Sequence, residues 1–341
     1  MRSSSVRRAF WNCLLAAIVA FPACAQAPHR HHAKAEPVAV SDPLAEANQA
    51  LQAGEADKAL ALLQPDTLPA ASQAEAHNLR CRVFFTLERW DQAIGECEQA
   101  IKLDSGNSDN HMWLARALGE KADRATFLSA YALAKRTRAE FELSVQLNPH
   151  NAEALADLGE FYSAAPGVVG GGTDKANAVA AQLDKVDPAR AHELRARIAA
   201  EQKDFTTAEQ EFKLAIASSL HPAFQWMTLA SFYRGRERWQ EMEQAIHSGN
   251  KAAERDKSAA VALYNGASVL TRANRDPELA AKMLENYLAS PVKTEEAPAF
   301  LAHIRLARLK DQLGDHDGAN QERAAAQALA QEYKPAQDGK H

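Results

Sequence analysis

Arginine and histidine recur together at a fixed spacing, and these are the side chains most suited to binding chemistry. Each of three histidines is followed five residues later by an arginine: His77 and Arg82, His111 and Arg116, His192 and Arg197. The planar arginine guanidinium binds a carboxylate through two parallel hydrogen bonds. Histidine can respond to pH or bind a metal, but single histidines in helical stretches are more often packing residues. The arginines are therefore candidates for carboxylate recognition, with ordinary exposed helix residues as the alternative, and the histidines are expected to be structural.

A glycine-rich segment, residues 165–172, is the second candidate for chemistry. A phosphate-binding loop requires Gly-x4-Gly-Lys-Ser/Thr after a strand. Gly167 and Gly172 have the spacing, but Thr173 and Asp174 follow them and a helical stretch precedes them. Three interpretations stay open: a wide turn, a small-ligand or enzymatic site, and a loop that contacts a partner, because binding residues gather on loops held by rigid scaffolds. The partner-contact interpretation assigns Gly167, Gly170, Gly171 and Gly172 to the site.

Catalytic and metal-binding patterns are absent from the sequence. There is no Ser/His/Asp or Cys/His set and no His-Glu-x-x-His spacing, and acid pairs such as Glu209–Glu211 lie in charged helical stretches. His29, His31 and His32 lie in a segment without helical periodicity, and histidine clusters hold metal well only where a fold fixes them. We therefore expect no enzymatic activity, no cofactor and no metal.

The first residues resemble an export signal. Arg2, Arg7 and Arg8 precede an apolar stretch from residue 9 to residue 21 and the small-residue site Ala23-Cys24-Ala25. This pattern predicts a signal peptide over residues 1–25 that is cleaved after Ala25, and a periplasmic or secreted protein. Lipid attachment to Cys24 is an alternative, as is an uncleaved anchor. No later apolar run has membrane-spanning length.

Composition narrows the classes of partner. The chain has 341 residues, a formal net charge of −5 and 46% hydrophobic residues. A protein that binds the phosphate backbone of nucleic acids carries a broad basic excess, so a nucleic-acid partner is disfavoured. Residues 26–42 are rich in Pro, Ala and His and are expected to be a disordered linker. The final residues 334–341 are expected to be a disordered tail.

An internal repeat organises the rest of the chain. A small residue, or methionine once, begins a helical stretch and is followed four positions later by an apolar residue in all but the last unit. These anchor residues are Ala59, Ala93, Thr137, Ala176, Ala208, Met242, Ala280 and Ala319. The steps between them run from 32 residues (Ala176 to Ala208) to 44 residues (Ala93 to Thr137). Apolar residues at three- and four-residue spacing between anchors predict amphipathic helices.

The repeat resembles the tetratricopeptide-repeat family, whose period is about 34 residues. The motif Trp226-x-x-Leu229-Ala230-x-x-Tyr233 carries the resemblance, and so does Leu155-x-x-Leu158-Gly159-x-x-Tyr162. Exported bacterial relatives with a Pro-Gly-x-x-Gly-Gly-Gly insert form a similar, uncharacterised subgroup. The resemblance implies an all-α, right-handed superhelical solenoid of about eight antiparallel helix pairs over residues 43–333. It also implies a solvent-facing cap at the polar final repeat, around Arg308 and Arg323.

The family architecture places the first helix of each pair along a concave groove. There it implies a binding surface for a protein or peptide, with an acidic or C-terminal segment as the hypothesis that the arginines suggest. The implied groove residues are Arg82, Arg116, Arg197, Asn78, Met112 and Trp113, with Met227, Tyr264 and Asn265 nearby. An envelope assembly factor is an alternative function. The sequence does not specify an oligomeric state.

The same resemblance brings two cysteines together. Cys81 and Cys97 are the two cysteines outside the signal, and the fold implies that their positions face each other. In an oxidising compartment a disulfide would close a loop of about 17 residues and stabilise the fold by about 3 kcal/mol. Two small buried thiols are the alternative.

Two units depart from the regular length. The third carries about ten additional residues between Gly119 and Lys135, whose composition predicts longer helices. The fourth carries the glycine-rich segment, after which Thr173 is the expected N-cap of the next helix. Both are in the second to fourth units, which is where we expect function to lie.

Overall fold

The computed structural model describes residues 42–64, 68–331 and 333, all of which belong to one compact unit, residues 41–341. The predicted signal peptide, the linker before Asp42 and the tail after Tyr333 lie outside the described residues. The described part contains sixteen α-helices, three short 3-10 helices and no strand. The α-helices are α1 (Pro43–Ala53), α2 (Ala56–Leu62), α3 (Gln73–Thr86), α4 (Trp90–Leu103), α5 (Ser108–Asp123), α6 (Phe127–Leu147), α7 (Ala152–Ala164), α8 (Thr173–Leu183), α9 (Pro188–Glu201), α10 (Phe205–Ser218), α11 (Pro222–Gly235), α12 (Trp239–Arg255), α13 (Val261–Ala273), α14 (Pro277–Ala289), α15 (Ala299–Gln312) and α16 (His316–Leu329).

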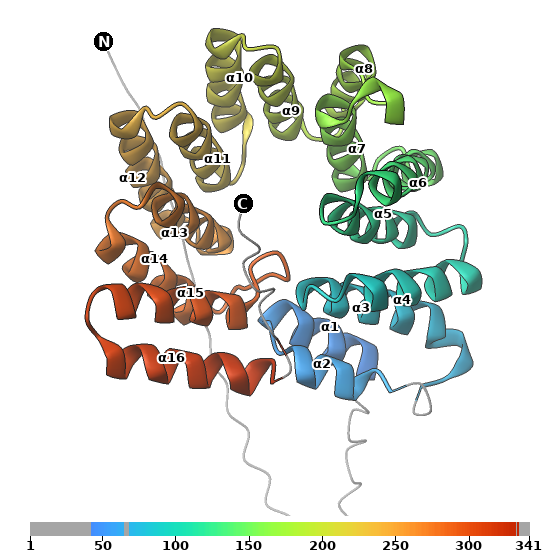
Figure 1. Cartoon of the computed structure of the whole chain (residues 1–341), viewed down its shortest axis with the longest axis horizontal. Coiled ribbons are helices and arrows are strands. Elements are labelled where there is room, and N and C mark those ends of the chain that lie inside the picture. The colour runs from blue at the N-terminus through green and yellow to red at the C-terminus, as the bar shows by residue number, and fades with distance from the viewer. Residues whose placement is uncertain (1–41, 65–67, 332, 334–341) are drawn as a thin grey trace, which may run out of the picture. The chain divides into compact units, whose positions relative to one another are not determined.

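These helices form eight consecutive antiparallel pairs, so the predicted all-α solenoid is confirmed. Each odd-numbered helix packs on the even-numbered helix that follows it, and the pairs stack on their neighbours (Figure 1). The anchor residues explain the close approach, because all eight are buried; Ala59, Ala93 and Ala208, for example, have no exposed surface. At the six alanine anchors, a side chain no larger than a methyl group lets two helix backbones approach closely.

Local capping sets the helix boundaries. Asp187, Asp204 and Asp276 each accept a hydrogen bond from a backbone N–H in the first turn of the following helix, as do Asn107 and Asn151. Such caps satisfy backbone donors that have no partner inside the helix. Proline at the first position of α9, α11 and α14 supports the same starts, since its fixed φ suits a helix and its missing donor is not needed there.

The third pair has the longer helices that the sequence predicts. Helix α6 has 21 residues and α5 has 16. The added length carries α6 beyond its neighbours, so the apolar residues at its start are not packed: Phe127 is 84% exposed and Leu128 81%.

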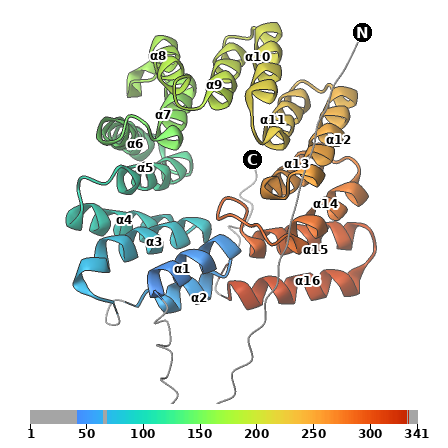
Figure 2. The ribbon, with the colours of Figure 1, turned by 180° about the vertical axis from the view of Figure 1, so that it is seen from behind.

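The last helix pair packs against the first, which corrects the expected solvent-facing cap. Phe300, Ala326 and Ala330 share one core cluster with Leu44 and Leu51. Helix α16 contacts α2, and the backbone N–H of Gln331 donates to Asp57 Oδ2 over 2.7 Å. Figures 1 and 2 show α15 and α16 beside α1 and α2 from both sides, so the eight pairs close into a ring. Arg308 and Arg323 of this last pair are nevertheless exposed.

Glycine makes the closure possible. Gly54 follows α1 with φ of +76°, and a Cβ atom there would lie 2.3 Å from the backbone nitrogen of Ala299. Any larger residue would push the first pair away from α15. In the described part of the chain, no helix is long and apolar enough to cross a membrane.

Candidate functional site

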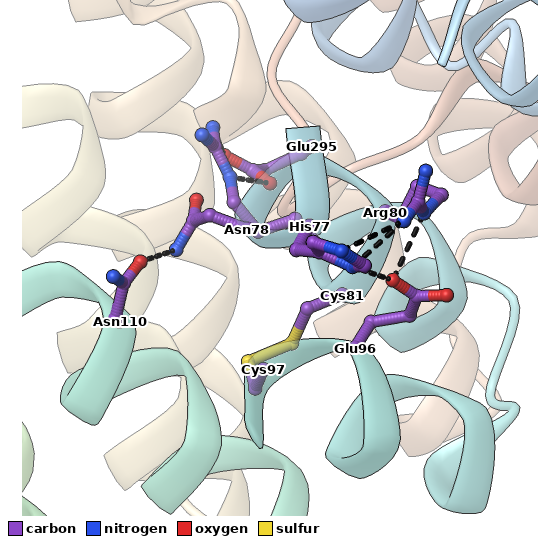
Figure 3. The surroundings of a disulfide bond; sticks show 9 residues. His77, Asn78, Arg80, Cys81, Glu96, Cys97, Asn110 and Glu295 are labelled. Atoms are coloured by element: carbon purple, nitrogen blue, oxygen red, sulfur yellow. Dashed lines mark hydrogen bonds and ion pairs between the residues drawn. A yellow bond between two sulfur atoms is a disulfide. The ribbon is translucent and has the colours of Figure 1, made fainter. Parts of the chain in front are cut away.

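Cys81 on α3 and Cys97 on α4 form a disulfide in the structure, with both residues fully buried. Figure 3 shows polar residues on both sides of it. On one side, Glu96 Oε2 binds His77 Nδ1 at 2.6 Å and Arg80 Nε at 2.9 Å. On the other, Asn78 donates to the side chain of Asn110. The disulfide therefore lies inside a network of side-chain hydrogen bonds that joins α3, α4 and α5.

A histidine–glutamate pair recurs in the same position of four helix pairs. The bonds are His77–Glu96, His111–Glu140, His192–Glu211 and His303–Glu322, each from Nδ1 of a first-helix histidine to a second-helix carboxylate at 2.6 to 2.7 Å. Each glutamate follows its anchor residue by three positions, so the register is the same. The sequence did contain a signal for His303, which precedes its anchor by 16 residues, like His77 and His192. These histidines join paired helices, which supports their structural interpretation.

The three predicted arginines already bind carboxylates of this chain. Arg82 holds both oxygens of Glu295 from the loop before α15. Arg116 donates to Asp157 at 2.6 Å and to Glu153 at 3.1 Å on α7. Arg197 donates to Glu193 at 2.9 Å and to Glu160 at 3.4 Å. Each arginine already has a carboxylate partner, so an acidic ligand at these arginines would have to replace an existing partner.

Other predicted groove residues divide between core and interior wall. Asn78 and Met112 are 9% and 3% exposed and lie in the core, so neither presents its side chain to a groove. Trp113 is 7% exposed, lines an interior cavity and has Arg116 over its ring at 4.6 Å. Tyr264 and Asn265 line another interior cavity.

The geometry of the glycine-rich loop explains its glycines as a tight turn. Gly170 has φ of +95°, and a Cβ atom on Gly171 would lie 1.8 Å from the carbonyl oxygen of Ala165. Gly172, not Thr173, is the N-cap residue of α8, which corrects the expected cap. No glycine of this loop lines a described cavity, whereas Ala165, Pro166 and Val169 do. The loop therefore contributes a wall rather than a cradle of backbone donors.

Three hollows lie along the interior wall, which is formed mainly by the odd-numbered helices. Their volumes are about 470, 710 and 660 Å³. Glu160 lines all three, and Arg197 and Thr228 line both the first and the second. Arg116 and Asp157 line both the second and the third. Because neighbouring hollows share lining residues, they lie side by side along the wall from α3 to α15, and we call this row of hollows the channel.

The channel contains two arginines that the sequence analysis did not single out. Arg305 lies over the ring of Tyr264 at 4.3 Å and donates to Ser268. Arg272 lines the same hollow. Among the described residues neither forms an ion pair with a carboxylate. Burial lowers the pKa of Arg305, and the charge of Arg272 adds to the decrease. The sequence held no signal for them, because only the folded ring shows which acids face each arginine.

Comparison with known proteins adds little beyond the fold. No family model matches the sequence, and no curated protein matches it either. Among solved structures, the chain is similar to a thermophilic tetratricopeptide-repeat protein of Thermus thermophilus. The two are 17% identical over 56% of this chain and 96% of that chain, with a TM-score of 0.48. The assignment of the fold rests instead on the eight helix pairs and their buried anchors.

Proposed function

We propose that this chain is a non-enzymatic scaffold that holds a segment of a protein partner inside its ring of helix pairs. The row of adjacent hollows along the interior wall is the observation that carries the proposal. Such a row suits an extended chain, whereas an enzyme or a small-molecule site is usually one enclosed pocket with a few converging polar groups. Binding residues placed on stacked helices are also held rigidly, which lowers the entropic cost of binding.

The acidic part of such a segment is proposed to bind at Arg272 and Arg305. Unlike Arg82, Arg116 and Arg197, these two have no carboxylate partner among the described residues. Arg305 is partly buried, so its guanidinium has lost hydration and a carboxylate that binds it forms a strong charge-assisted hydrogen bond. Arg272 is exposed and adds a second positive charge to the same hollow. Phe212, Met227 and Phe232 line the same hollow and can cover apolar atoms next to that carboxylate.

Binding of a labelled peptide tests this proposal directly. A fluorescein-labelled peptide that alternates glutamate with leucine is titrated with the protein, and fluorescence anisotropy is recorded. Arg305→Met with Arg272→Gln is expected to weaken binding by about tenfold or more, since each lost charge-assisted bond is worth about 1.5–3 kcal/mol. The matched control, Arg255→Gln with Arg323→Gln, removes the same charge from exposed positions on α12 and α16. Equal binding by both double variants would refute the site.

A cellular measurement tests the scaffold role itself. A photo-crosslinking amino acid at Asn265, inside the channel, is expected to capture a protein partner. Capture is expected to fall when Arg305→Met is added. The same amino acid at Lys251, on the outer helix α12, serves as the control. Crosslinks that form equally from both positions would contradict binding inside the channel.

Export is part of the proposal. The Cys81–Cys97 disulfide supports it, since disulfides persist in oxidising compartments and are rare in the cytosol. Fractionation of cells that express the full chain is expected to place the mature protein outside the cytoplasm, with an N-terminus at Gln26. A mature protein found in the membrane fraction, and released by Cys24→Ser, would favour the lipoprotein alternative.

A further inference from the structure

The third hollow has four aromatic side chains in its walls. Phe85, Trp113, Phe141 and Phe161 line it together with Pro166 and Val169. The rings of Phe85 and Trp113 meet edge to face at 5.4 Å. Trp113 and Phe141 are buried, which fixes their orientation. We name this hollow of about 660 Å³ the aromatic cavity.

The irregular units of the repeat build this cavity. Helix α6 of the lengthened pair contributes Ala134, Thr137 and Phe141, and the glycine-rich loop contributes Pro166 and Val169. The tight turn at Gly170 and Gly171 keeps that loop against α6, since Arg138 of α6 packs on Gly170. The two departures from regular repeat length therefore meet at one place and shape one cavity.

Carboxylates dominate the polar residues around the aromatic cavity. Six acidic residues line it, Glu120, Asp123, Asp157, Glu160, Glu295 and Glu296, against Arg116 as the one basic residue. In the described part of the chain, Asp123 and Glu296 form no ion pair. Glu296 is accessible to solvent inside the ring, yet partial desolvation raises its pKa and Glu153 raises it further. A cation bound there would relieve both effects.

Thr137 adds an independent sign of an unfilled site. Its side chain lines the aromatic cavity and is 3% exposed, but its hydroxyl oxygen has no hydrogen-bond partner among the described residues. A buried hydroxyl without a partner costs about 1–3 kcal/mol, so natural proteins rarely keep one. A polar atom next to the apolar part of a ligand would satisfy it.

We infer that the aromatic cavity binds a basic, apolar segment of a partner protein, with a lysine or arginine side chain directed to Asp123 and Glu296. The inference rests on the proposed scaffold function and names the chemistry of a second part of the bound segment. Aromatic walls accept the apolar stem of such a side chain and attract its charge. The channel then carries opposite charge preferences at its two ends, which orients the bound chain.

Three labelled peptides separate the contributions of charge and apolar contact. One alternates lysine with leucine, the second replaces lysine by glutamate, and the third replaces leucine by serine. Anisotropy titrations are run with the intact mature protein. We expect the lysine–leucine peptide to bind more tightly than the serine peptide. We also expect its binding at this site to weaken as salt is raised.

Two variants locate the binding. Ala134→Trp fills the aromatic cavity without removing a core contact and is expected to weaken binding of the lysine–leucine peptide by about tenfold or more. Asp123→Asn with Glu296→Gln is expected to weaken binding of the same peptide by about three- to tenfold. The charge-matched control is Glu254→Gln with Glu285→Gln, on the outer helices α12 and α14. It is expected to leave binding of the lysine–leucine peptide unchanged.

The outcomes distinguish this inference from the scaffold proposal. Unchanged binding of the lysine–leucine peptide by Ala134→Trp, with native circular dichroism, would overturn the inference. So would binding of the serine peptide as tight as that of the leucine peptide. The glutamate–leucine peptide is expected to keep its Arg305-dependent binding in Ala134→Trp. If that binding persists while the lysine–leucine peptide fails to bind the unsubstituted protein, the inference is wrong and the scaffold proposal stands.

Discussion

At the scale of single residues, the repeated histidine–glutamate pairs are the main electrostatic feature of the fold. His111 is the most buried of them, with 4% exposure, and its second ring nitrogen lies 3.1 Å from the carbonyl oxygen of Ser105. The hydrogen bond to Glu140 raises the pKa of His111 despite its burial. A raised pKa means that the folded state binds a proton more tightly than the unfolded state, so the pair stabilises the fold most when the histidine is charged.

Replacement of His111 by glutamine tests this linkage. The stabilisation is fully present below the ordinary histidine pKa of about 6.5 and is lost as pH rises through the higher folded value. We expect His111→Gln to lower the free energy of unfolding by about 1–3 kcal/mol near pH 6 and by less near pH 8. Urea unfolding at both pH values measures this. The control is His316→Gln, whose side chain is 76% exposed. An equal loss at both pH values would show that the charge of His111 plays no part.

At the scale of elements, the loop between α7 and α8 shows how an insertion is fitted to a repeat. Its turn is held by two backbone hydrogen bonds. The Gly172 N–H donates to the carbonyl oxygen of Tyr162 at 2.8 Å, and the Gly171 N–H donates to the carbonyl oxygen of Pro166. The chain passes so close to itself at Gly171 that only hydrogen fits on the α-carbon. Gly167, in contrast, has no atom within 4 Å of the place where a Cβ would lie.

Two alanine substitutions in this loop should therefore differ. Gly171→Ala places a methyl group against backbone, which cannot move as a side chain can, and we expect a destabilisation of about 1–3 kcal/mol. Gly167→Ala is expected to be close to neutral. Thermal unfolding compares them, and the lysine–leucine peptide reports whether the wall of the aromatic cavity has moved. Similar stability of the two variants would contradict the tight turn.

At the scale of the whole ring, the contact between the first and last helix pairs turns an open row of repeats into a closed one. Phe300 is 1% exposed within this contact, and Arg82 and Gln52 bind Glu295 across it. The contact covers the apolar faces that the two terminal pairs would otherwise expose to water. It also places the loop of Glu295 and Glu296 in the channel wall.

A single methyl group should open this contact. Gly54→Ala adds a Cβ in a left-handed conformation and against the backbone of Ala299. We expect the radius of gyration, measured by small-angle X-ray scattering, to increase while the helical circular dichroism is retained. Gly235→Ala is the matched control, because nothing lies within 4 Å of its Cβ position. An unchanged radius in Gly54→Ala would contradict a ring closed by direct contact at this glycine.

The sequence by itself determined the helix pairs. The anchors from Ala59 to Ala319 and the apolar residues four positions after all but the last of them depend on neighbours within one or two turns, so they are readable as local patterns. The extra length of the third unit and the turn in the fourth could be predicted for the same reason. The exposure of Phe127 could not, because a helical pattern does not say where the neighbouring helices end.

The tertiary structure alone decided what the interior offers to a ligand. Arg82 meets Glu295, 213 residues away, and that contact exists only because small rotations between successive pairs add up to a closed ring. Ring closure thereby neutralises Arg82, whereas Arg116 and Arg197 bind acids of an adjacent helix pair. Arg305 and the carboxylates of Asp123 and Glu296 remain without an ion-pair partner among the described residues. Each charge is visible in the sequence, but which charges meet across the ring is set by the accumulated geometry of all eight pairs.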